Sequence, residues 1–510
     1  MSFRYFLCLL YFWGILASVK AFAQKDEVTQ GKTLAETYCG ACHAFPSPEL
    51  LPKEIWKAHV LPQMAAYMGF QEAQDSLAIW EKRSPEEIQI LKNLNVYPAE
   101  AIIGADDFQK ISNYYFLEAP EILAAQKLKA IPIPLEGFEA KNLFIEGIQS
   151  PMTSMVAINE SRAELLISDA NAKQLYAKTI TDELFTLPSI ESPVVQFIPK
   201  SPGVFDFMTI GSIAPSDLSQ GALYELDLNS GTWNQILENL SRPVYGIWKD
   251  LEKDGKPDFL LCNYGHHVGN ISIYKDGDFQ SEPLTLGGAG ARKLEVLDLN
   301  QDGKLDIIAL FAQGNERISV FYNQGNGNFS PEQILLRFSP VMGSSYFEMH
   351  DFNQDGLLDI LYTNGDNWDY SAVNKPYHGF RIFENKGNEQ FEESWFYPQY
   401  GAAKAMALDY DQDGDLDFVS IAFYDDLENP NNQFLLFENQ GNMIFQARYI
   451  PEASLAKWLT LDLGDLDSDG DLDIVFGAYN HNFREFSKLL IQGIKEVPSV
   501  LILENQKNDD

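Results

Sequence analysis

Five nine-residue segments carry oxygen-bearing side chains at a spacing suited to a hard cation. Residues 409–417 read DYDQDGDLD, and segments that begin at 465, 351, 298 and 250 read DLDSDGDLD, DFNQDGLLD, DLNQDGKLD and DLEKDGKPD. Positions one, three, five and nine offer carboxylate or amide oxygens, and glycine at position six permits the sharp turn that lets them converge. This pattern predicts calcium binding. The expected ligands in the four most regular segments are Asp298, Asn300, Asp302, Asp306, Asp351, Asn353, Asp355, Asp359, Asp409, Asp411, Asp413, Asp417, Asp465, Asp467, Asp469 and Asp473.

The segment that begins at 250 departs from this pattern. Glu252 stands at position three, and Pro257 precedes the ninth residue, Asp258. We therefore expect four or five calcium ions, the fifth depending on this segment. After position nine come short apolar runs, such as Ile474-Val475-Phe476, which are typical of buried strands. An EF-hand would instead need a glutamate at position twelve and a helix after the loop.

A second constellation, Cys39-Gly40-Ala41-Cys42-His43, is a C-x-x-C-H motif. Two thiols at this spacing can form thioethers with the vinyl groups of haem, and the adjacent histidine can ligate the iron. A zinc site would need a second pair of ligands, and a thioredoxin-like site would need a βαβ context. The sequence around the motif offers neither. We therefore expect covalent haem c, held by Cys39, Cys42 and His43.

The residues after this motif have helical patterns. The run Ser84-Pro85-Glu86-Glu87 combines an N-cap residue, a proline at the first helical position and acids in the first turn. Residues 106–117 form a further candidate helix, with apolar side chains at helical spacing.

Residues 24–125 resemble a small c-type cytochrome domain. The motif at Cys39 is followed by a stretch from Trp56 to Met64 that is similar to the tryptophan-to-methionine stretch of such domains. The resemblance implies that Met64 is the distal haem ligand. Met68, one helical turn further on, and His59 remain alternatives.

The first 23 residues have the features of a secretory signal peptide. Arg4 precedes an apolar run from Tyr5 to Val19, and Ala21-Phe22-Ala23 forms a small-x-small cleavage site. The run is short for a membrane span, and no later stretch is long and apolar enough for one. The mature chain is therefore expected to be periplasmic or extracellular, without a transmembrane segment. The net charge of −36 argues against nucleic acid as a partner and favours a basic redox partner.

The acidic segments recur at intervals of 48, 53, 58 and 56 residues, which indicates a repeat architecture. Between them, strand-like runs end in Asn-x-Gly turns, as in residues 319–325, 381–387 and 435–441. This pattern predicts that each unit forms a four-stranded blade, with the acidic loop between its first two strands.

Residues 141–510 resemble the FG-GAP/VCBS repeats of integrin-α-like β-propellers. Two units without acidic loops, at 155–178 and 205–233, bring the expected number of blades to seven, with six or eight as alternatives. The expected fold is a small all-α cytochrome c-like domain followed by an all-β propeller.

Residues 126–140 are expected to act as a linker or closing strand. Pro132 and Pro134 exclude a helix or a central strand there. The last unit ends at Leu503-Glu504-Asn505 without a fourth strand, and an open ring would leave exposed edges. A strand within residues 128–144 is therefore predicted to complete the last blade.

The loops after the second strand of each blade should lie on the face opposite the acidic loops. They carry polar and aromatic residues, among them His266, Trp368, Tyr370, Asp425 and His481. These features favour an exported electron-transfer protein with the propeller as docking scaffold. A haem-coupled oxidoreductase acting on a small molecule or sugar at this rim, and an adhesion or glycan-binding module, are the alternatives. No catalytic residue is predicted, since the sequence contains no recognisable catalytic motif.

Overall fold

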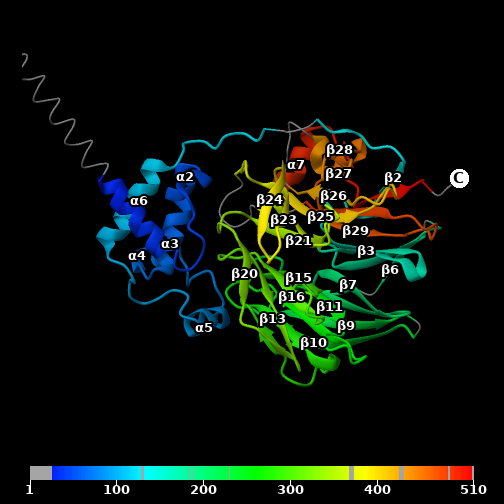
Figure 1. Ribbon diagram of the computed structural model, residues 1–510, viewed down its shortest axis with the longest axis horizontal. Helices are drawn as coiled ribbons and strands as arrows, with labels where there is room; N and C mark the ends of the chain where they lie inside the picture. The colour runs from blue at the N-terminus through cyan, green and yellow to red at the C-terminus, as the bar shows by residue number, and fades with distance from the viewer. Residues whose placement is uncertain are drawn as a thin grey trace, which may run out of the picture. The chain divides into compact units, whose positions relative to one another are not determined.

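The computed structural model describes residues 26–127, 131–181, 183–187, 189–228, 230–366, 373–423, 430–480 and 483–507. The predicted signal peptide, residues 1–23, lies outside these ranges. The chain divides into two compact units, one helical and one a β-propeller (Figure 1). Within the described residues, no helix is both long enough and apolar enough to cross a membrane.

The helical unit occupies residues 26–118 and begins with a helix over residues 26–38. The α-helices that follow are α2 (Lys53–Ile55), α3 (Leu61–Tyr67), α4 (Gln71–Ser76), α5 (Pro85–Asn93) and α6 (Ala105–Glu118). A five-residue π-helical segment, η2 (Trp56–Val60), joins α2 to α3. The predicted start of α5 is confirmed, because Ser84 and Glu87 form a reciprocal capping box.

Two aromatic side chains fasten the loop after the C-x-x-C-H motif to the helical core. The Trp56 indole donates to the Pro48 carbonyl over 2.9 Å, and the Tyr115 hydroxyl donates to the Pro46 carbonyl over 2.7 Å. The two rings pack with centroids 4.3 Å apart, and both side chains are buried. These bonds therefore hold the segment after the motif, which includes the short 3-10 helix η1 (Pro48–Leu50), against the helical core.

The propeller consists of seven blades, each built on four antiparallel strands, and a fifth strand adds to blade 6. Blades 1 and 2 have no acidic loop, as predicted. Their strands are β3 (Thr153–Asn159), β4 (Glu164–Asp169), β5 (Gln174–Thr179), β6 (Leu184–Thr186), β7 (Val194–Ser201), β8 (Val204–Thr209), β9 (Gly221–Asp227) and β10 (Thr232–Leu240).

Blades 3, 4 and 5 each have an acidic loop between the first and second strands. Their strands are β11 (Pro243–Lys249), β12 (Asp258–Asn263), β13 (Asn270–Tyr274), β14 (Leu284–Leu286), β15 (Ala291–Leu297), β16 (Asp306–Phe311), β17 (Arg317–Phe321), β20 (Gln333–Arg337), β21 (Ser344–His350), β22 (Asp359–Asn364), β23 (Gly379–Asn385) and β24 (Phe391–Pro398). A small hairpin of β18 (Asn323–Gly325) and β19 (Asn328–Phe329) follows β17.

Blades 6 and 7 complete the ring with strands from both ends of the propeller sequence. Their strands are β25 (Ala402–Leu408), β26 (Asp417–Ala422), β27 (Phe434–Asn439), β28 (Phe445–Tyr449), β29 (Trp458–Gly464), β30 (Asp473–Ala478) and β31 (Val500–Asn505). The helix α7 (Phe483–Ile491) lies between β30 and β31 in sequence.

The closure of the last blade by a strand from the linker is confirmed. The strand β2 (Phe138–Leu143) pairs antiparallel with β31, from Phe138 opposite Asn505 to Leu143 opposite Val500. Figure 1 shows β2, in cyan, beside the red C-terminal part of the chain. A second strand, β1 (Ile133–Pro134), is an edge strand formed by the proline-containing part of the same linker. It adds to blade 6 by pairing parallel with β28.

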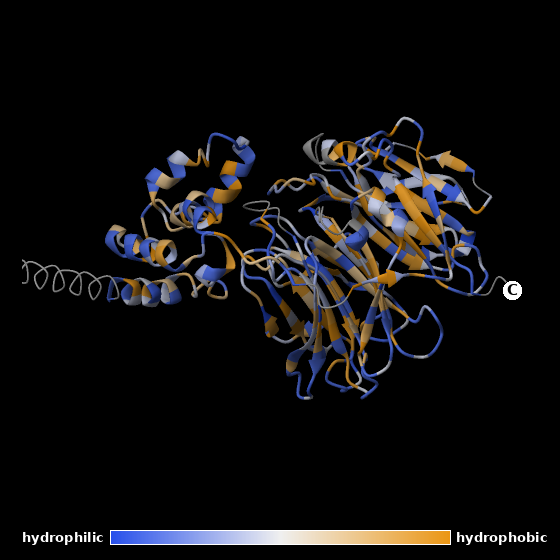
Figure 2. Ribbon diagram, turned by 90° about the horizontal axis from the view of Figure 1, so that it is seen from above, coloured by the Kyte–Doolittle hydropathy of each residue, from blue (hydrophilic) through white to orange (hydrophobic). Residues whose placement is uncertain are grey.

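The second strand of each blade is almost completely buried. In the five blades with acidic loops, every residue of this strand is buried. Hydrophobic residues therefore concentrate in the sheets, and hydrophilic ones in the loops that connect them (Figure 2). The apolar runs after the acidic segments were correctly predicted as buried strands.

Side chains from the inner strands bind the backbone of the neighbouring blade. Lys293 Nζ donates to the Phe347 carbonyl over 2.8 Å, and Lys404 Nζ donates to the Leu461 carbonyl over the same distance. Across the closure of the ring, Asp462 of blade 7 accepts from the Ile158 amide of blade 1 over 2.9 Å. These bonds satisfy backbone groups of the inner edge strands, which have no strand partner on that side.

Candidate metal and haem sites

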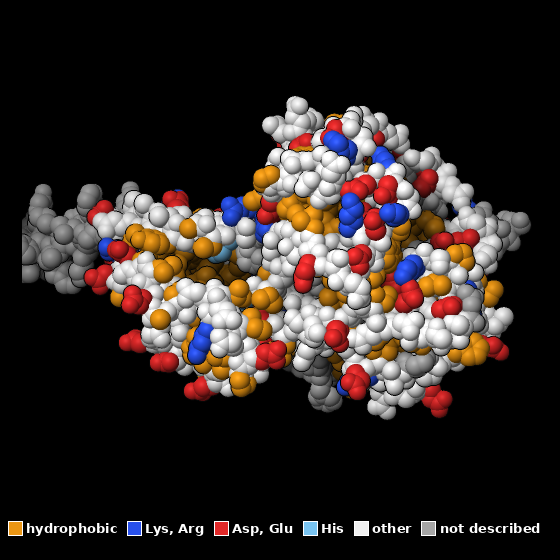
Figure 3. Space-filling model, turned by 90° about the horizontal axis from the view of Figure 1, so that it is seen from below, with side chains coloured by type: hydrophobic (Ala, Val, Ile, Leu, Met, Phe, Trp, Pro, Cys, Tyr) orange, Lys and Arg blue, Asp and Glu red, His pale blue; other side chains and the backbone are white. Residues whose placement is uncertain are grey.

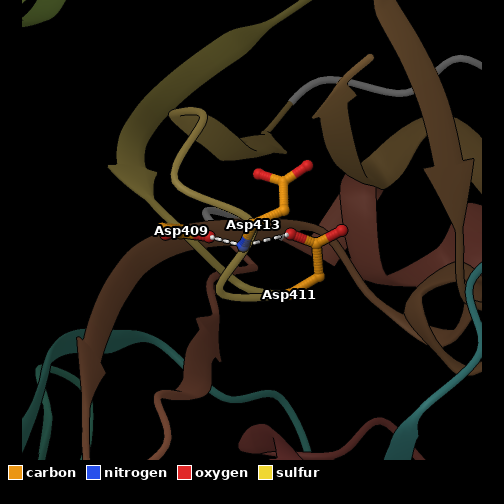
Figure 4. Close-up of side chains that lie close together, drawn as sticks. All are labelled: Asp409, Asp411 and Asp413. Atoms are coloured by element: carbon orange, nitrogen blue, oxygen red, sulfur yellow. Dashed lines mark hydrogen bonds between the residues drawn. The ribbon is translucent and has the colours of Figure 1, made fainter. Parts of the chain in front are cut away.

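The five acidic loops share one backbone arrangement. In the loop of blade 6, the Asp409 carboxylate accepts from the amides of Asp413 and Gly414, each over 3.1 Å. Figure 4 shows the Asp413 nitrogen between the carboxylates of Asp409 and Asp411 (Figure 4). Gly414 has a φ of +92°, a conformation that side chains with a Cβ atom rarely adopt. The first, third and sixth positions therefore shape the turn itself.

The ninth aspartate has a structural role that the sequence pattern did not reveal. Asp417 is the first residue of β26 and is buried. Its carboxylate accepts from the Tyr410 amide over 3.2 Å and from the Asn439 amide, at the end of β27, over 2.8 Å. The other four loops form an equivalent pair of bonds. The second donor is an asparagine amide in blades 4, 5 and 7 and the Asp276 amide, just beyond β13, in blade 3. The ninth residue, predicted only as a calcium ligand, therefore anchors the loop to the third strand.

Burial of these anchoring carboxylates disfavours their charged form. It raises the pKa of Asp417 and of Asp473 to about 7, and that of Asp359 to about 6. A cation close to the loop would favour the charged form again.

Two loops bring three carboxylates close enough to share one ion. In blade 6 these are Asp409, Asp411 and Asp413, and each offers an oxygen within 4.8 Å of the other two. In blade 7, Asp465 and Asp467 meet the ninth residue, Asp473, within the same limit. The donor set is oxygen alone, which suits calcium. In the absence of a cation, such carboxylates repel one another.

Amides replace a carboxylate at position three in the loops of blades 4 and 5. Asn300 Oδ1 accepts from the Asp302 amide over 3.0 Å, and Asn353 Oδ1 accepts from the Asp355 amide over 2.9 Å. The side-chain oxygen at position three therefore forms the same turn as in blade 6, but in blades 4 and 5 this position carries no negative charge.

Lysines neutralise acids in or beside the loops of blades 3 and 4. Lys275 lies 3.0 Å from Glu252, the irregular third residue of the first loop. Lys304, at position seven of the next loop, lies 2.9 Å from Asp302. A lysine ammonium in or beside a loop reduces the repulsion between its carboxylates, which a metal ion would otherwise relieve. Calcium should therefore stabilise these two loops less than the loops without such a lysine. This agrees with the irregular sequence of the first loop.

The asparagine side chain of the Asn-x-Gly turn forms hydrogen bonds both to an acidic loop and within its own turn. In blade 6 the Asn439 side chain donates to the Leu416 carbonyl over 3.3 Å and accepts from the Gly441 amide over 3.2 Å. The sequence pattern predicted only a turn at this point. The signal that could have revealed more was the fixed recurrence of asparagine at this place in the repeat.

In the helical unit, the C-x-x-C-H motif follows the helix over residues 26–38 directly. The His43 Nδ1 atom lies 2.9 Å from the Ala44 carbonyl oxygen, which can only accept, so Nδ1 carries the proton. This tautomer leaves the lone pair on Nε2, the arrangement required of a histidine that ligates iron.

The two thiols of the motif have different surroundings. Cys39 is partly buried beside the Tyr115 hydroxyl, and burial raises its pKa to about 11. Cys42 is exposed. One cysteine of the motif therefore lies at the edge of the hydrophobic core and the other at the surface.

The three candidates for the distal ligand differ in burial. Met64, on α3, is partly buried and packs against the same hydrophobic cluster as Cys39. Met68 is 8 % exposed and is itself a core member of that cluster, whereas His59 is exposed. On the helical unit, Figure 3 shows hydrophobic side chains gathered around a hollow beside a histidine (Figure 3). Met64 therefore combines packing against this cluster with partial exposure, as a distal ligand would need.

On the propeller face opposite the acidic loops, an aspartate and a histidine form a close pair. Asp217 Oδ2 lies 2.7 Å from His267 Nδ1, and Asp217 Oδ1 accepts from the His267 amide over 2.6 Å. The ring of His266 lies against that of His267, with centroids 4.1 Å apart. The sequence pattern indicated His266 but not this pair. Trp368, Tyr370, Asp425 and His481 lie outside the described residues.

The sequence model of the FG-GAP-like repeat matches residues 250–309, 298–362 and 409–476, which include all five acidic loops. Within the propeller, residues 250–362 and 409–476 are therefore similar to FG-GAP-like repeats. These repeats contain both the anchoring aspartates and the two carboxylate triads.

Solved structures with a similar fold have low sequence identity to this chain. The N-terminal domain of Nup159 is 12 % identical with a TM-score of 0.44, covering 74 % of this chain and 98 % of that one. Virginiamycin B lyase from Staphylococcus aureus is also 12 % identical with a TM-score of 0.44, covering 72 % and 98 %. At these values neither likeness bears on function. No curated protein matches the sequence.

Proposed function

We propose that this chain is an exported c-type haem protein for electron transfer, with a calcium-stabilised propeller as the docking scaffold for its redox partner. The observation that carries the proposal is the arrangement around the C-x-x-C-H motif. Cys39 and Met64 pack against one hydrophobic cluster, and His43 has the tautomer needed for a ligand. Bound haem would supply the one-electron chemistry, and these residues would attach it and shield it from water.

The experiment that tests haem attachment is expression in a periplasm that matures c-type cytochromes. The wild-type protein should carry haem that survives denaturation, and the Cys39→Ser/Cys42→Ser double variant should not. His43→Ala should lower the yield of haem protein without affecting the propeller. Wild-type protein with unmodified thiols, purified from cells in which a control cytochrome matures, would overturn the proposal.

The proposed partner is a basic redox protein, because the surface of this chain is acidic. The formal net charge is −36, and acidic side chains are spread over the face shown in Figure 3. Complementary charge accelerates association, and salt screens this effect. Haem reduction by a basic protein should therefore slow as salt is added, whereas an acidic reductant should show no such slowing. An equal salt response for both would contradict the proposed docking.

Calcium in the acidic loops is the second component of the proposal. The triads of blades 6 and 7 support it most directly, because their carboxylate oxygens already converge. Titration calorimetry with calcium should show at least two bound ions, and chelation should lower the melting temperature of the propeller. A flat titration would remove calcium from the proposed function but would leave the haem part intact.

One observation favours a second candidate function, a haem-coupled oxidoreductase. Asp217 is almost fully buried and orients His267, whose side chain is 14 % exposed, in the way that a general base is oriented. A small molecule or sugar oxidised there would give up two electrons and two protons; His267 would take up a proton, and the haem would accept the electrons one at a time, being reoxidised by the redox partner between them. Substrate-dependent haem reduction that is lost in His267→Ala but retained in His350→Ala would support this function. A screen of sugars and alcohols that gives no haem reduction would leave electron transfer as the proposed function.

A further inference from the structure

The loops of blades 6 and 7 differ from the others in charge. Each contains five aspartates and neither lysine nor arginine, whereas the loop of blade 4 includes Lys304 and that of blade 3 contains Lys253 and Lys256. They are also the two loops whose carboxylates form triads. A bound cation therefore changes the electrostatic energy of these two loops more than that of the loops with internal lysines.

The same two blades receive the strands that close the ring. The strand β1 adds to blade 6, and β2 adds to blade 7. The two closing strands therefore belong to the blades with the greatest need for a cation.

Contacts join the closing strand directly to both acidic loops. The Phe138 ring, at the start of β2, stacks against the ring of Tyr410, the second residue of the blade 6 loop, with centroids 6.2 Å apart. The Tyr410 carbonyl accepts from the Asn505 side chain over 3.4 Å, and the Asn505 amide donates to Asp473 of the blade 7 loop over 3.0 Å. Asn505 is also the β31 residue that pairs with Phe138. One residue thus contacts both loops and the closing strand.

We propose that calcium in the loops of blades 6 and 7 controls closure of the propeller by residues 131–143. The inference rests on the calcium part of the proposed function. With calcium bound, the carboxylates of each loop are neutralised, and Tyr410 and Asn505 are fixed in the positions on which β2 docks. Without calcium, repulsion among the aspartates displaces these two residues, and the β2 edge opens locally. The loops of blades 3 and 4 keep their conformation without calcium, because lysines neutralise part of their negative charge.

Hydrogen exchange of the full mature chain, in calcium and in chelator, tests this proposal. The backbone amides of β2 should exchange at least tenfold faster in chelator, whereas those of β8 and β9 in blade 2 should change little. Equal exchange of β2 in both conditions would overturn the proposal. An equal acceleration in all blades would also overturn it, because calcium would then stabilise the ring as a whole.

Variants separate closure from calcium binding. Asp415→Lys places a lysine at position seven of the blade 6 loop, where blade 4 has Lys304. In this variant the ratio of the β2 exchange rate in chelator to that in calcium should fall towards one. The matched control Leu357→Lys, at position seven in blade 5, should leave the ratio near its wild-type value. Tyr410→Ala should keep two calcium ions bound but make β2 exchange fast in both conditions. Calcium binding with unchanged exchange would refute this inference alone, whereas absent calcium binding would refute the calcium scaffold as well.

Discussion

Lys293 of blade 4 and Glu348 of blade 5 face each other across a blade boundary, with Nζ and Oε1 3.6 Å apart and the side chains 4 % and 10 % exposed. Glu348 also accepts from the Ala407 amide of blade 6 over 2.9 Å and from His350 over 3.2 Å. A single carboxylate thus joins three successive blades, and its loss would leave a buried lysine without this counter-charge.

Replacing Glu348 by glutamine should destabilise the propeller in a pH-dependent way. At neutral pH we expect a loss of about 2 kcal/mol in the free energy of unfolding, because the hydrogen bonds of a buried carboxylate are weakened while Glu295, 2.8 Å from Lys293, remains as a counter-charge. Burial by itself would raise the pKa of Glu348, but Lys293, His350 and the Ala407 amide outweigh it and lower the pKa to about 2. The wild-type carboxylate therefore contributes stability above pH 4.5, and this contribution is lost as the pH falls towards 2.

Urea denaturation of both proteins between pH 7 and pH 3 measures this effect. The difference between wild type and Glu348→Gln should shrink as the pH falls. Glu146→Gln, at an exposed position, should stay within about 0.5 kcal/mol of wild type throughout. A difference that is constant across this pH range would contradict the role assigned to the charge.

Replacing Asp359 by alanine should destabilise blade 5 whether or not calcium is present. The Asp359 carboxylate accepts from the amides of Phe352 and Asn385, over 3.1 and 2.8 Å, and the residue is fully buried. Two buried donors without acceptors should together cost about 3 kcal/mol. Asp355→Ala is the matched variant, since Asp355 is exposed at position five of the same loop. The melting temperature of Asp355→Ala should differ from that of wild type mainly when calcium is present. If Asp355→Ala and Asp359→Ala lower the melting temperature equally in chelator, the anchoring role of Asp359 is refuted.

Substitutions of the two methionines should separate ligation from packing. If Met64 ligates the iron, Met64→Ala should abolish the weak far-red absorption band of a methionine-ligated ferric haem and lower the reduction potential. Met68→Ala should keep the band but lower stability by about 3 kcal/mol, because the Met68 side chain belongs to the core. A band that persists in Met64→Ala and disappears in Met68→Ala would assign the ligand to Met68.

Cysteine labelling should distinguish Cys39, Cys42 and Cys262, the three thiols outside the predicted signal peptide. Cys262 lies in β12 and is fully buried, and burial raises its pKa far above the ordinary value. A thiol reagent should therefore not modify native haem protein at pH 8, and one thiol should react on unfolding. The Cys39→Ser/Cys42→Ser variant should give the same count. Three reactive thiols in unfolded wild type would show that no thioethers had formed.

Much of the propeller was predictable because its information is local. Each acidic loop lies next to the strand that it precedes, so the nine-residue pattern predicted both the turn and the buried strand, as at Asp417 and the residues of β26. The reciprocal cap of Ser84 and Glu87 was predictable for the same reason, since the two residues are one helical turn apart. The haem motif is equally local, and its chemistry stays a prediction until haem is measured.

What the sequence by itself determined was therefore the repeat, its loops and strands, and the need for a strand to close the ring. Only the tertiary structure decided which residues from different blades contact each other in the closed ring. Asn505 pairs with Phe138 and reaches Tyr410, and Glu348 meets Lys293, although these partners lie far apart in the chain. Such contacts depend on how seven sheets curve into a circle, and no local spacing encodes that curvature. The acidic loop of blade 6 thus has a second role, visible only in three dimensions, as the surface on which the closing strand docks.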